Sequence, residues 1–239
     1  MNNPMLNVAR PLSVDCDGQV IPAVYWLPDC ACEGVVIACH GGSGHKLSVA
    51  ILAIAGACLP LGLAVLAIDG PVHGDRRTDG SLDPQTAVRS FREAWQAGVG
   101  RTSMAREMIA ALDALLSLHG LEDLPIGYIG VSMGTGYGLP LLGTEKRIEA
   151  AAIGLWGMNF PASEHLIGYA KSIRCPVWFT QQWDDQTFDR EGTFALFDAI
   201  GSIDKRLIAY PGPHRELEGE RLDDAVAFLQ KRLAKRRHG

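Results

Sequence analysis

Short, continuous apolar runs alternate along most of the chain with longer stretches of helical periodicity. Six runs have the length and the uniformly apolar character of strands that are covered on both faces: Gly34–Cys39, Leu63–Ile68, Ile126–Val131, Ala150–Trp156, Pro176–Thr180 and Arg206–Tyr210. The helical stretches are Lys46–Leu59, Pro84–Leu118, Gly134–Leu142, Glu164–Lys171, Arg190–Ile200 and Asp223–Lys235. This alternation predicts an α/β fold with a mostly parallel central sheet and helices on both faces.

The first part of the chain has a different pattern. Two strand-like stretches, Val8–Val14 and Gln19–Leu27, flank Asp15-Cys16-Asp17-Gly18, whose residues favour a tight hairpin turn. We expect this hairpin to add antiparallel strands at one edge of the sheet. No linker, internal repeat or low-complexity segment follows, so residues 1–239 are expected to form a single domain.

Composition narrows the classes of partner. Apolar residues make up 47% of the chain and charged residues 21%, as in ordinary globular proteins. The net charge of −5, from 22 basic and 27 acidic residues, does not favour nucleic-acid binding. We therefore expect a small-molecule partner and no nucleic acid, while the sequence leaves a homodimer open.

The same data bear on membranes, location and metals. The longest apolar run, Val49–Leu61, is too short to span a bilayer, and the first residues lack the pattern of a secretory signal. We expect a cytoplasmic protein without a membrane partner, whose cysteines are reduced. The spacing of Cys30, Cys32 and Cys39 matches no common zinc pattern, so neither a metal nor another cofactor is expected.

One pentapeptide, Gly130-Val131-Ser132-Met133-Gly134, carries a chemical signal. It follows a predicted strand, begins a predicted helix and matches G-x-S-x-G, the pattern of a nucleophile elbow. In that sharp turn the serine hydroxyl stands above the sheet, near the free N–H groups of the helix N-terminus, and bulky flanking residues would clash. An ordinary β–α turn is the alternative, but the strand before it and the helix after it favour a nucleophile.

A serine hydroxyl needs a base at neutral pH, and the base needs a group that orients it. His214 follows the last predicted strand, and Asp184 and Asp185 follow the strand that ends at Thr180. All of these groups lie at carboxyl ends of strands, where parallel α/β sheets bind ligands. On the residues alone, either aspartate can accept the N–H of His214.

The loop after the first parallel strand reads His40-Gly41-Gly42-Ser43-Gly44-His45-Lys46. Glycines let a backbone approach a ligand closely, and two backbone N–H groups usually hold the oxyanion of acyl transfer. We expect one from Met133 and the other from Gly42, with Gly41 or Ser43 as alternatives. The loop lacks the spacing of a nucleotide-binding loop.

The stretch from 74 to 101 allows two interpretations: a small lid over residues 76–101, or an ordinary helix with an irregular start. As a lid, it would bring Arg76 or Arg77 to a substrate carboxylate and Trp95 to an apolar group. His73 is placed to line the pocket, but it precedes the serine in sequence and is a poor candidate for the base.

The His-Gly-Gly loop, the G-x-S-x-G turn, the aspartate and the histidine together resemble the α/β-hydrolase superfamily, from about Gly34 to the end. The 53 positions from Ser132 to Asp185 leave no room for a large cap domain, as in dienelactone-hydrolase-like enzymes and small carboxylesterases. Dienelactone hydrolases proper use cysteine, so Ser132 favours general ester chemistry. The resemblance implies that Asp185 is the residue that orients His214, because in these families a small apolar segment and the start of a helix follow that aspartate within three or four residues. Asp184 is then a candidate for substrate binding.

These features predict a serine hydrolase that cleaves a small or compact carboxylic ester through an acyl-enzyme. A thioesterase, a peptidase or an acyltransferase would use the same three residues, because fold and site do not by themselves choose the substrate. A ligand-binding protein that kept the fold without turnover is the alternative from another class.

Overall fold

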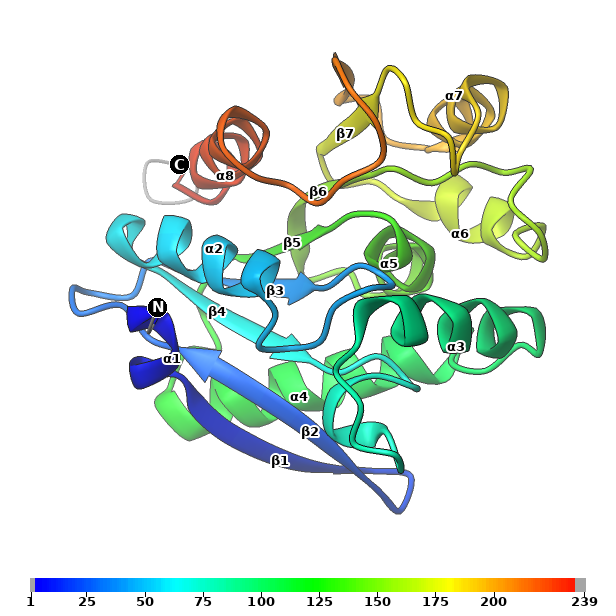
Figure 1. Ribbon diagram of the computed structural model, residues 1–239. Helices are drawn as coiled ribbons and strands as arrows, with labels where there is room; N and C mark the ends of the chain where they lie inside the picture. The colour runs from blue at the N-terminus through cyan, green and yellow to red at the C-terminus, as the bar shows by residue number, and fades with distance from the viewer. Residues whose placement is uncertain (1–2, 235–239) are drawn as a thin grey trace.

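The computed structural model describes residues 3–234, and one eight-stranded sheet runs through them (Figure 1). The strands are β1 (Arg10–Cys16), β2 (Gln19–Trp26), β3 (Gly34–Cys39), β4 (Leu63–Ile68), β5 (Ile126–Gly130), β6 (Ile148–Gly154), β7 (Val177–Gln182) and β8 (Lys205–Tyr210). Their order across the sheet is β1-β2-β4-β3-β5-β6-β7-β8. Strands β3 to β8 pair in parallel, while β2 pairs antiparallel with both β1 and β4. The predicted fold class is confirmed, including the N-terminal hairpin.

Helices cover both faces of the sheet. They are α1 (Pro4–Val8), α2 (Val49–Cys58), α3 (Pro84–Gln96), α4 (Ser103–His119), α5 (Met133–Thr144), α6 (Leu166–Ser172), α7 (Arg190–Ala199) and α8 (Glu220–Leu233). Figure 1 shows α2 and α8 side by side on one face, with α4 on the other face, behind β1 and β2 in this view. Each face has its own apolar core, one around Trp26 and Ile51 and the other around Trp95 and Trp156. Burial on both sides explains why β3 and β4 are apolar at every position.

Local signals account for several helix ends. The Asp83 side chain accepts the Thr86 N–H at 2.7 Å and caps α3, and Asp189 caps α7 in the same way through Gly192, also at 2.7 Å. Helix α4 ends at Gly120, whose φ of 63° is a left-handed conformation that glycine adopts at no steric cost. The segments that lead to α3 and α7 follow β4 and β7, so they start at the carboxyl edge of the sheet.

The structure corrects three predicted elements. The stretch Pro84–Leu118 is not one helix: α3 ends at Gln96 and α4 begins at Ser103, because Gly98 and Gly100, with φ of 81° and 78°, turn the chain between them. The strand expected from Val8 begins at Arg10, since Val8 closes the short helix α1. The last predicted helix ends at Leu233, and its expected final residue, Lys235, lies outside the described residues.

The large aromatic side chains are not all buried in the core. Large aromatic side chains are usually core residues. Trp156 is fully buried, but Trp183 is 47% exposed and carries the Arg190 guanidinium 4.0 Å above its ring. Phe160 is half-buried and lines a pocket.

No cap domain is inserted: only α5, β6 and α6 separate β5 from β7. The loops that follow β3, β4, β5, β7 and β8 therefore remain open at one edge of the sheet. Within residues 3–234, no helix has the length and apolar character needed to cross a lipid bilayer.

Candidate active site

Ser132 occupies the sharp turn between β5 and α5, with φ of 56° and ψ of −123°. A non-glycine residue in such a conformation costs about 1–3 kcal/mol, so the surroundings must hold it. The Ser132 N–H donates to the Gly154 carbonyl at 3.0 Å, and its own carbonyl accepts the N–H groups of Thr135 at 2.8 Å and Gly136 at 3.1 Å. The turn is thus anchored to β6 and α5, with the serine hydroxyl beyond the end of β5.

Both glycines of the pentapeptide face the end of β3. A Cβ on Gly134 would lie 2.8 Å from the carbonyl oxygen of Cys39, and one on Gly130 would lie 3.0 Å from the same oxygen. The first turn of α5 therefore packs directly on the backbone of β3. This close approach brings the N-terminus of α5 next to the glycine-rich loop, which begins at His40.

We expect Gly134→Ala to lower the free energy of unfolding by about 2 kcal/mol, because its Cβ would meet a backbone oxygen that cannot rotate away. The matched control is Gly168→Ala in α6, where a Cβ meets nothing within 4 Å. That control should gain up to about 1 kcal/mol from helix propensity. Urea unfolding of both variants measures the difference; equal stabilities would contradict the close packing at Cys39.

Ser132, His214 and Asp185 form a hydrogen-bonded chain across the open edge of the sheet. His214 Nε2 lies 3.1 Å from Ser132 Oγ, and His214 Nδ1 lies 2.7 Å from Asp185 Oδ2. A carboxylate only accepts, so Nδ1 carries the proton and the Nε2 lone pair faces the serine hydroxyl. This arrangement can move a proton from the serine to the imidazole while the carboxylate stabilises the resulting positive charge.

The Asp185 carboxylate is held by three donors. Besides His214, the backbone N–H groups of Thr187 and Phe188 donate to its Oδ1 at 2.7 and 3.0 Å, and its side chain is only 3% exposed. Burial acts to raise the pKa of Asp185, but the hydrogen bonds and the charge of His214 outweigh it and hold that pKa below its ordinary value. Asp185 is therefore ionised and fixed at neutral pH.

Asp184 has a different role, which corrects its expected place in substrate binding. It is exposed, its carboxylate accepts the Gly212 N–H at 3.2 Å, and its own N–H donates to the Gly212 carbonyl at 3.1 Å. The residue ties the loop after β7 to the loop after β8. It does not line the pocket that contains Ser132.

The two expected oxyanion donors are both free. Gly42 lines the same pocket as Ser132, and Met133 begins α5, where the first N–H groups of a helix have no partner of their own. Neither the Gly42 N–H nor the Met133 N–H donates to another residue in the described part of the chain. Unpaired N–H groups beside a serine hydroxyl suit an oxyanion.

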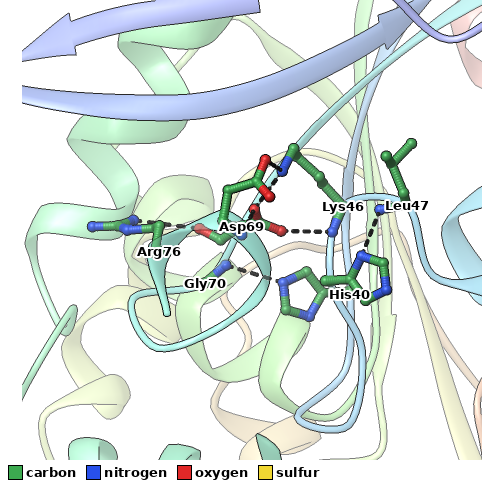
Figure 2. Close-up of polar contacts among 8 residues, drawn as sticks. His40, Lys46, Leu47, Asp69, Gly70 and Arg76 are labelled. Carbon is green, nitrogen blue, oxygen red and sulfur yellow. Dashed lines mark hydrogen bonds and ion pairs between the residues drawn. The ribbon is translucent and has the colours of Figure 1, made fainter. Parts of the chain in front are cut away.

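The glycine-rich loop is clamped by the loop after β4 (Figure 2). Lys46 Nζ lies 2.6 Å from Asp69 Oδ2, the Lys46 N–H donates to Asp69 Oδ1 at 2.8 Å, and the Asp69 side chain is completely buried. His40 accepts the Gly70 N–H at Nε2 and donates from Nδ1 to the Gly41 carbonyl. Burial lowers the pKa of His40 well below its ordinary value, so the ring is neutral.

His73 was expected to line the pocket, but it does not. It supports the glycine-rich loop from the side away from the pocket. The ring is buried, and its Nε2 donates to the Gly42 carbonyl at 3.0 Å. Burial lowers the pKa of His73 to about 4, so it is neutral at neutral pH. Gly41, another candidate for substrate contact, likewise lies behind the pocket.

The expected substrate contacts of Arg76 and Trp95 are wrong. The Arg76 guanidinium forms two hydrogen bonds with the buried carboxylate of Glu107 and a third with the Asp69 carbonyl. Trp95 is completely buried, and its indole N–H donates to the Pro161 carbonyl at 2.9 Å. Both side chains serve the fold beneath the site.

A pocket of about 250 Å³ opens over Ser132 and His214. Sequence reasoning missed eight of its twelve lining residues: Val88, Phe91, Arg92, Phe160, Thr187, Phe188, Arg215 and Glu216. The first three lie at i, i+3 and i+4 on α3, so the helical spacing was a usable signal that this part of residues 76–101 presents one face to the site. Among residues 3–234, no group of three or more His, Cys, Asp or Glu side chains is placed to hold a metal ion.

Similar solved structures are hydrolases. No protein-family model matches the sequence, and no curated protein is significantly similar to it. A cold-adapted esterase from an Arctic intertidal metagenomic library shares 33% identity over 94% of both chains, with a TM-score of 0.85. The dienelactone hydrolase of Anabaena variabilis shares the fold at 18% identity, 95% and 96% coverage and a TM-score of 0.68. An esterase of Pyrococcus furiosus also shares the fold, at 15% identity over 98% of this chain and 96% of its own, with a TM-score of 0.75.

Proposed function

Because the chain belongs to the α/β-hydrolase superfamily, we propose that it cleaves carboxylic esters with a serine nucleophile and an acyl-enzyme intermediate. Its similar structures are esterases, and dienelactone hydrolase has the same fold. The observation that supports the proposal most strongly is the hydrogen-bonded chain from Ser132 through His214 to Asp185, open to a pocket. The residue types and their geometry match what acyl transfer to water requires.

In this mechanism Ser132 Oγ attacks the ester carbonyl while His214 Nε2 takes its proton. The N–H groups of Gly42 and Met133 donate to the oxyanion, and Asp185 stabilises the imidazolium. His214 then returns the proton to the alcohol oxygen as the C–O bond breaks, which leaves the acyl group on Ser132. A water molecule that gives its proton to His214 then attacks this acyl-enzyme. His214 returns that proton to Ser132 Oγ as the bond between Oγ and the acyl carbon breaks, and the carboxylic acid leaves.

The pocket favours short or compact acyl groups. Its volume is about 250 Å³, and Phe91, Phe160 and Phe188 contribute aromatic rings to its walls. Ligand pockets for larger molecules usually start at about 300 Å³. A long alkyl chain would have to leave the pocket and lie along the surface.

We expect purified enzyme to turn over p-nitrophenyl acetate or butyrate with a kcat/KM roughly 100-fold above that for the laurate. A fluorophosphonate probe should label the folded protein at one serine. Matched acyl-thioesters and anilides of the preferred acyl group serve as comparison substrates. Faster turnover of the thioester or the anilide would replace the esterase assignment by a thioesterase or a peptidase. Tight ligand binding without labelling or turnover would indicate a binding protein.

A further inference from the structure

Glu216 is an acidic group at the site that the proposed mechanism does not use. It lies in the loop between β8 and α8, two residues after His214, and lines the pocket together with Ser132. On its other side it borders a small internal cavity lined by Cys39 and His40 at the end of β3. The residue retains partial exposure, but its carboxyl group is turned toward the glycine-rich loop.

The Glu216 carboxyl rests directly on the backbone of Gly41. A Cβ on Gly41 would lie 1.9 Å from Glu216 Oε1, so no other residue fits at position 41 while Glu216 keeps this place. The Gly41 carbonyl accepts from His40 Nδ1 at 2.8 Å and from the Gly44 N–H at 3.0 Å. This carbonyl belongs to the same planar, trans peptide group as the Gly42 N–H, which must point the opposite way. Glu216 and His40 thus bracket the peptide group that carries one oxyanion donor.

The ionisation of Glu216 is linked to that of His214. Burial raises the pKa of Glu216 to about 7, while the charge of His214 and the Gly41 N–H act to lower it. The other charged or titratable groups that face it are Arg215 on its own loop, Cys39 and His40 at the end of β3, and Arg92 across the pocket.

Two of these neighbours, Cys39 and His40, carry no charge at neutral pH. Burial raises the pKa of Cys39 to about 12 and lowers that of His40 well below its ordinary value, so both stay neutral. Arginine keeps its charge at every accessible pH. A negative charge on Glu216 therefore acts on a charge that appears on His214 as the serine is deprotonated.

We propose that Glu216 is a positioning residue of the ester-cleaving reaction: its carboxylate holds Gly41 in place, so that the adjoining Gly42 N–H faces the oxyanion, and it favours the imidazolium form of His214 in the transition state. The inference rests on the proposed function, because both effects act through groups of that mechanism. It gives a role to the partly buried carboxyl two residues after the base and to the glycine at position 41.

The test compares Glu216→Gln with Glu218→Gln. The first keeps the size of the side chain and removes its charge. The second makes the same change two residues later, where the exposed carboxylate pairs with Arg215 and Arg221 and does not line the pocket. We expect Glu216→Gln to lower kcat about tenfold with little change in KM, since the lost interaction strengthens in the transition state. The control should match wild type.

The pH profile separates this role from simple packing. Without the negative charge, His214 stays neutral to lower pH, so the midpoint of the acidic limb of kcat/KM should move down in Glu216→Gln. The shift should be less than about one pH unit, because a carboxyl with a pKa of about 7 is only partly ionised there. Glu216→Asp keeps the charge and should keep the wild-type midpoint despite a slower rate. All variants should still react with the fluorophosphonate probe.

Two results would overturn the proposal. One is a Glu216→Gln enzyme with wild-type kcat and an unmoved midpoint. The other is a variant whose melting temperature falls while its pH profile stays that of wild type, which is the signature of packing alone. A wild-type protein that neither labels nor turns over esters would instead overturn the proposed function, and this inference with it.

Discussion

Ser132→Ala is expected to lower kcat for the best p-nitrophenyl ester by about 10⁴-fold or more and to abolish fluorophosphonate labelling. The substitution removes the oxygen that forms the bond to the acyl group. It leaves the hydrogen bond between His214 and Asp185, at 2.7 Å, in place. Activity that remains would come from water in a pocket that still binds the ester and its oxyanion.

The control for this experiment is Ser117→Ala, an exposed serine on α4. Its labelling and turnover should equal those of wild type. The melting temperature of Ser132→Ala should stay within a few degrees of wild type, because alanine at φ of 56° bears the same backbone strain and only one hydrogen bond, worth about 1 kcal/mol, is lost. Undiminished labelling of Ser132→Ala would place the reactive serine elsewhere and reject the proposed mechanism.

The second large effect is a loss of kcat that we expect at Asp185 but not at its neighbour Asp184. Asp185→Asn should reduce kcat by about 10⁴-fold, because an amide can donate to His214 Nδ1 and so favours the tautomer whose Nε2 carries a proton and cannot accept one from serine. Asp184→Asn makes the same chemical change at an exposed residue whose carboxylate accepts the Gly212 N–H. Its kcat should stay within about twofold of wild type, since exposed substitutions of this kind have small effects.

Steady-state kinetics of both variants on one ester decide between the two aspartates. Similar losses in both would mean that the loop between β7 and α7 rearranges when either residue changes. A loss confined to Asp184→Asn would move the acid to that position and overturn the assignment of Asp185. Because both variants replace a carboxylate by an amide, differences in charge do not explain a difference in rate.

Several features of the site could be predicted because their signals are local. Strands covered on both faces must be apolar at every position, as in β3 and β4, and such runs stand out in any sequence. A serine flanked by glycines in a G-x-S-x-G pattern directly after such a strand predicts the sharp strand-to-helix turn in which Ser132 lies. Parallel strands end at one edge of the sheet, so the sequence alone indicates that Ser132 and His214, 82 positions apart, should meet there.

Other features depended on contacts between distant segments. No local signal at Arg76 points to Glu107, its buried partner 31 positions later, and none at Trp95 points to burial beneath Pro161. The adjacent residues Asp184 and Asp185 have the same chemistry in sequence. They differ only in what the loops after β7 and β8 bring to each carboxylate, Gly212 in one case and His214 in the other.

The sequence by itself determined the α/β fold, the strand-end location of the chemical groups and the choice of Ser132 and His214 as candidate nucleophile and base, because periodicity and turn chemistry are properties of neighbouring residues. The family resemblance pointed to Asp185, but only the tertiary structure shows that its carboxylate contacts His214. The tertiary structure alone also decided which side chains of α3 reach the pocket and where Glu216 lies. Those outcomes depend on burial and on hydrogen bonds between segments far apart in the chain. Such contacts exist only once the sheet has assembled and has fixed the relative positions of its loops.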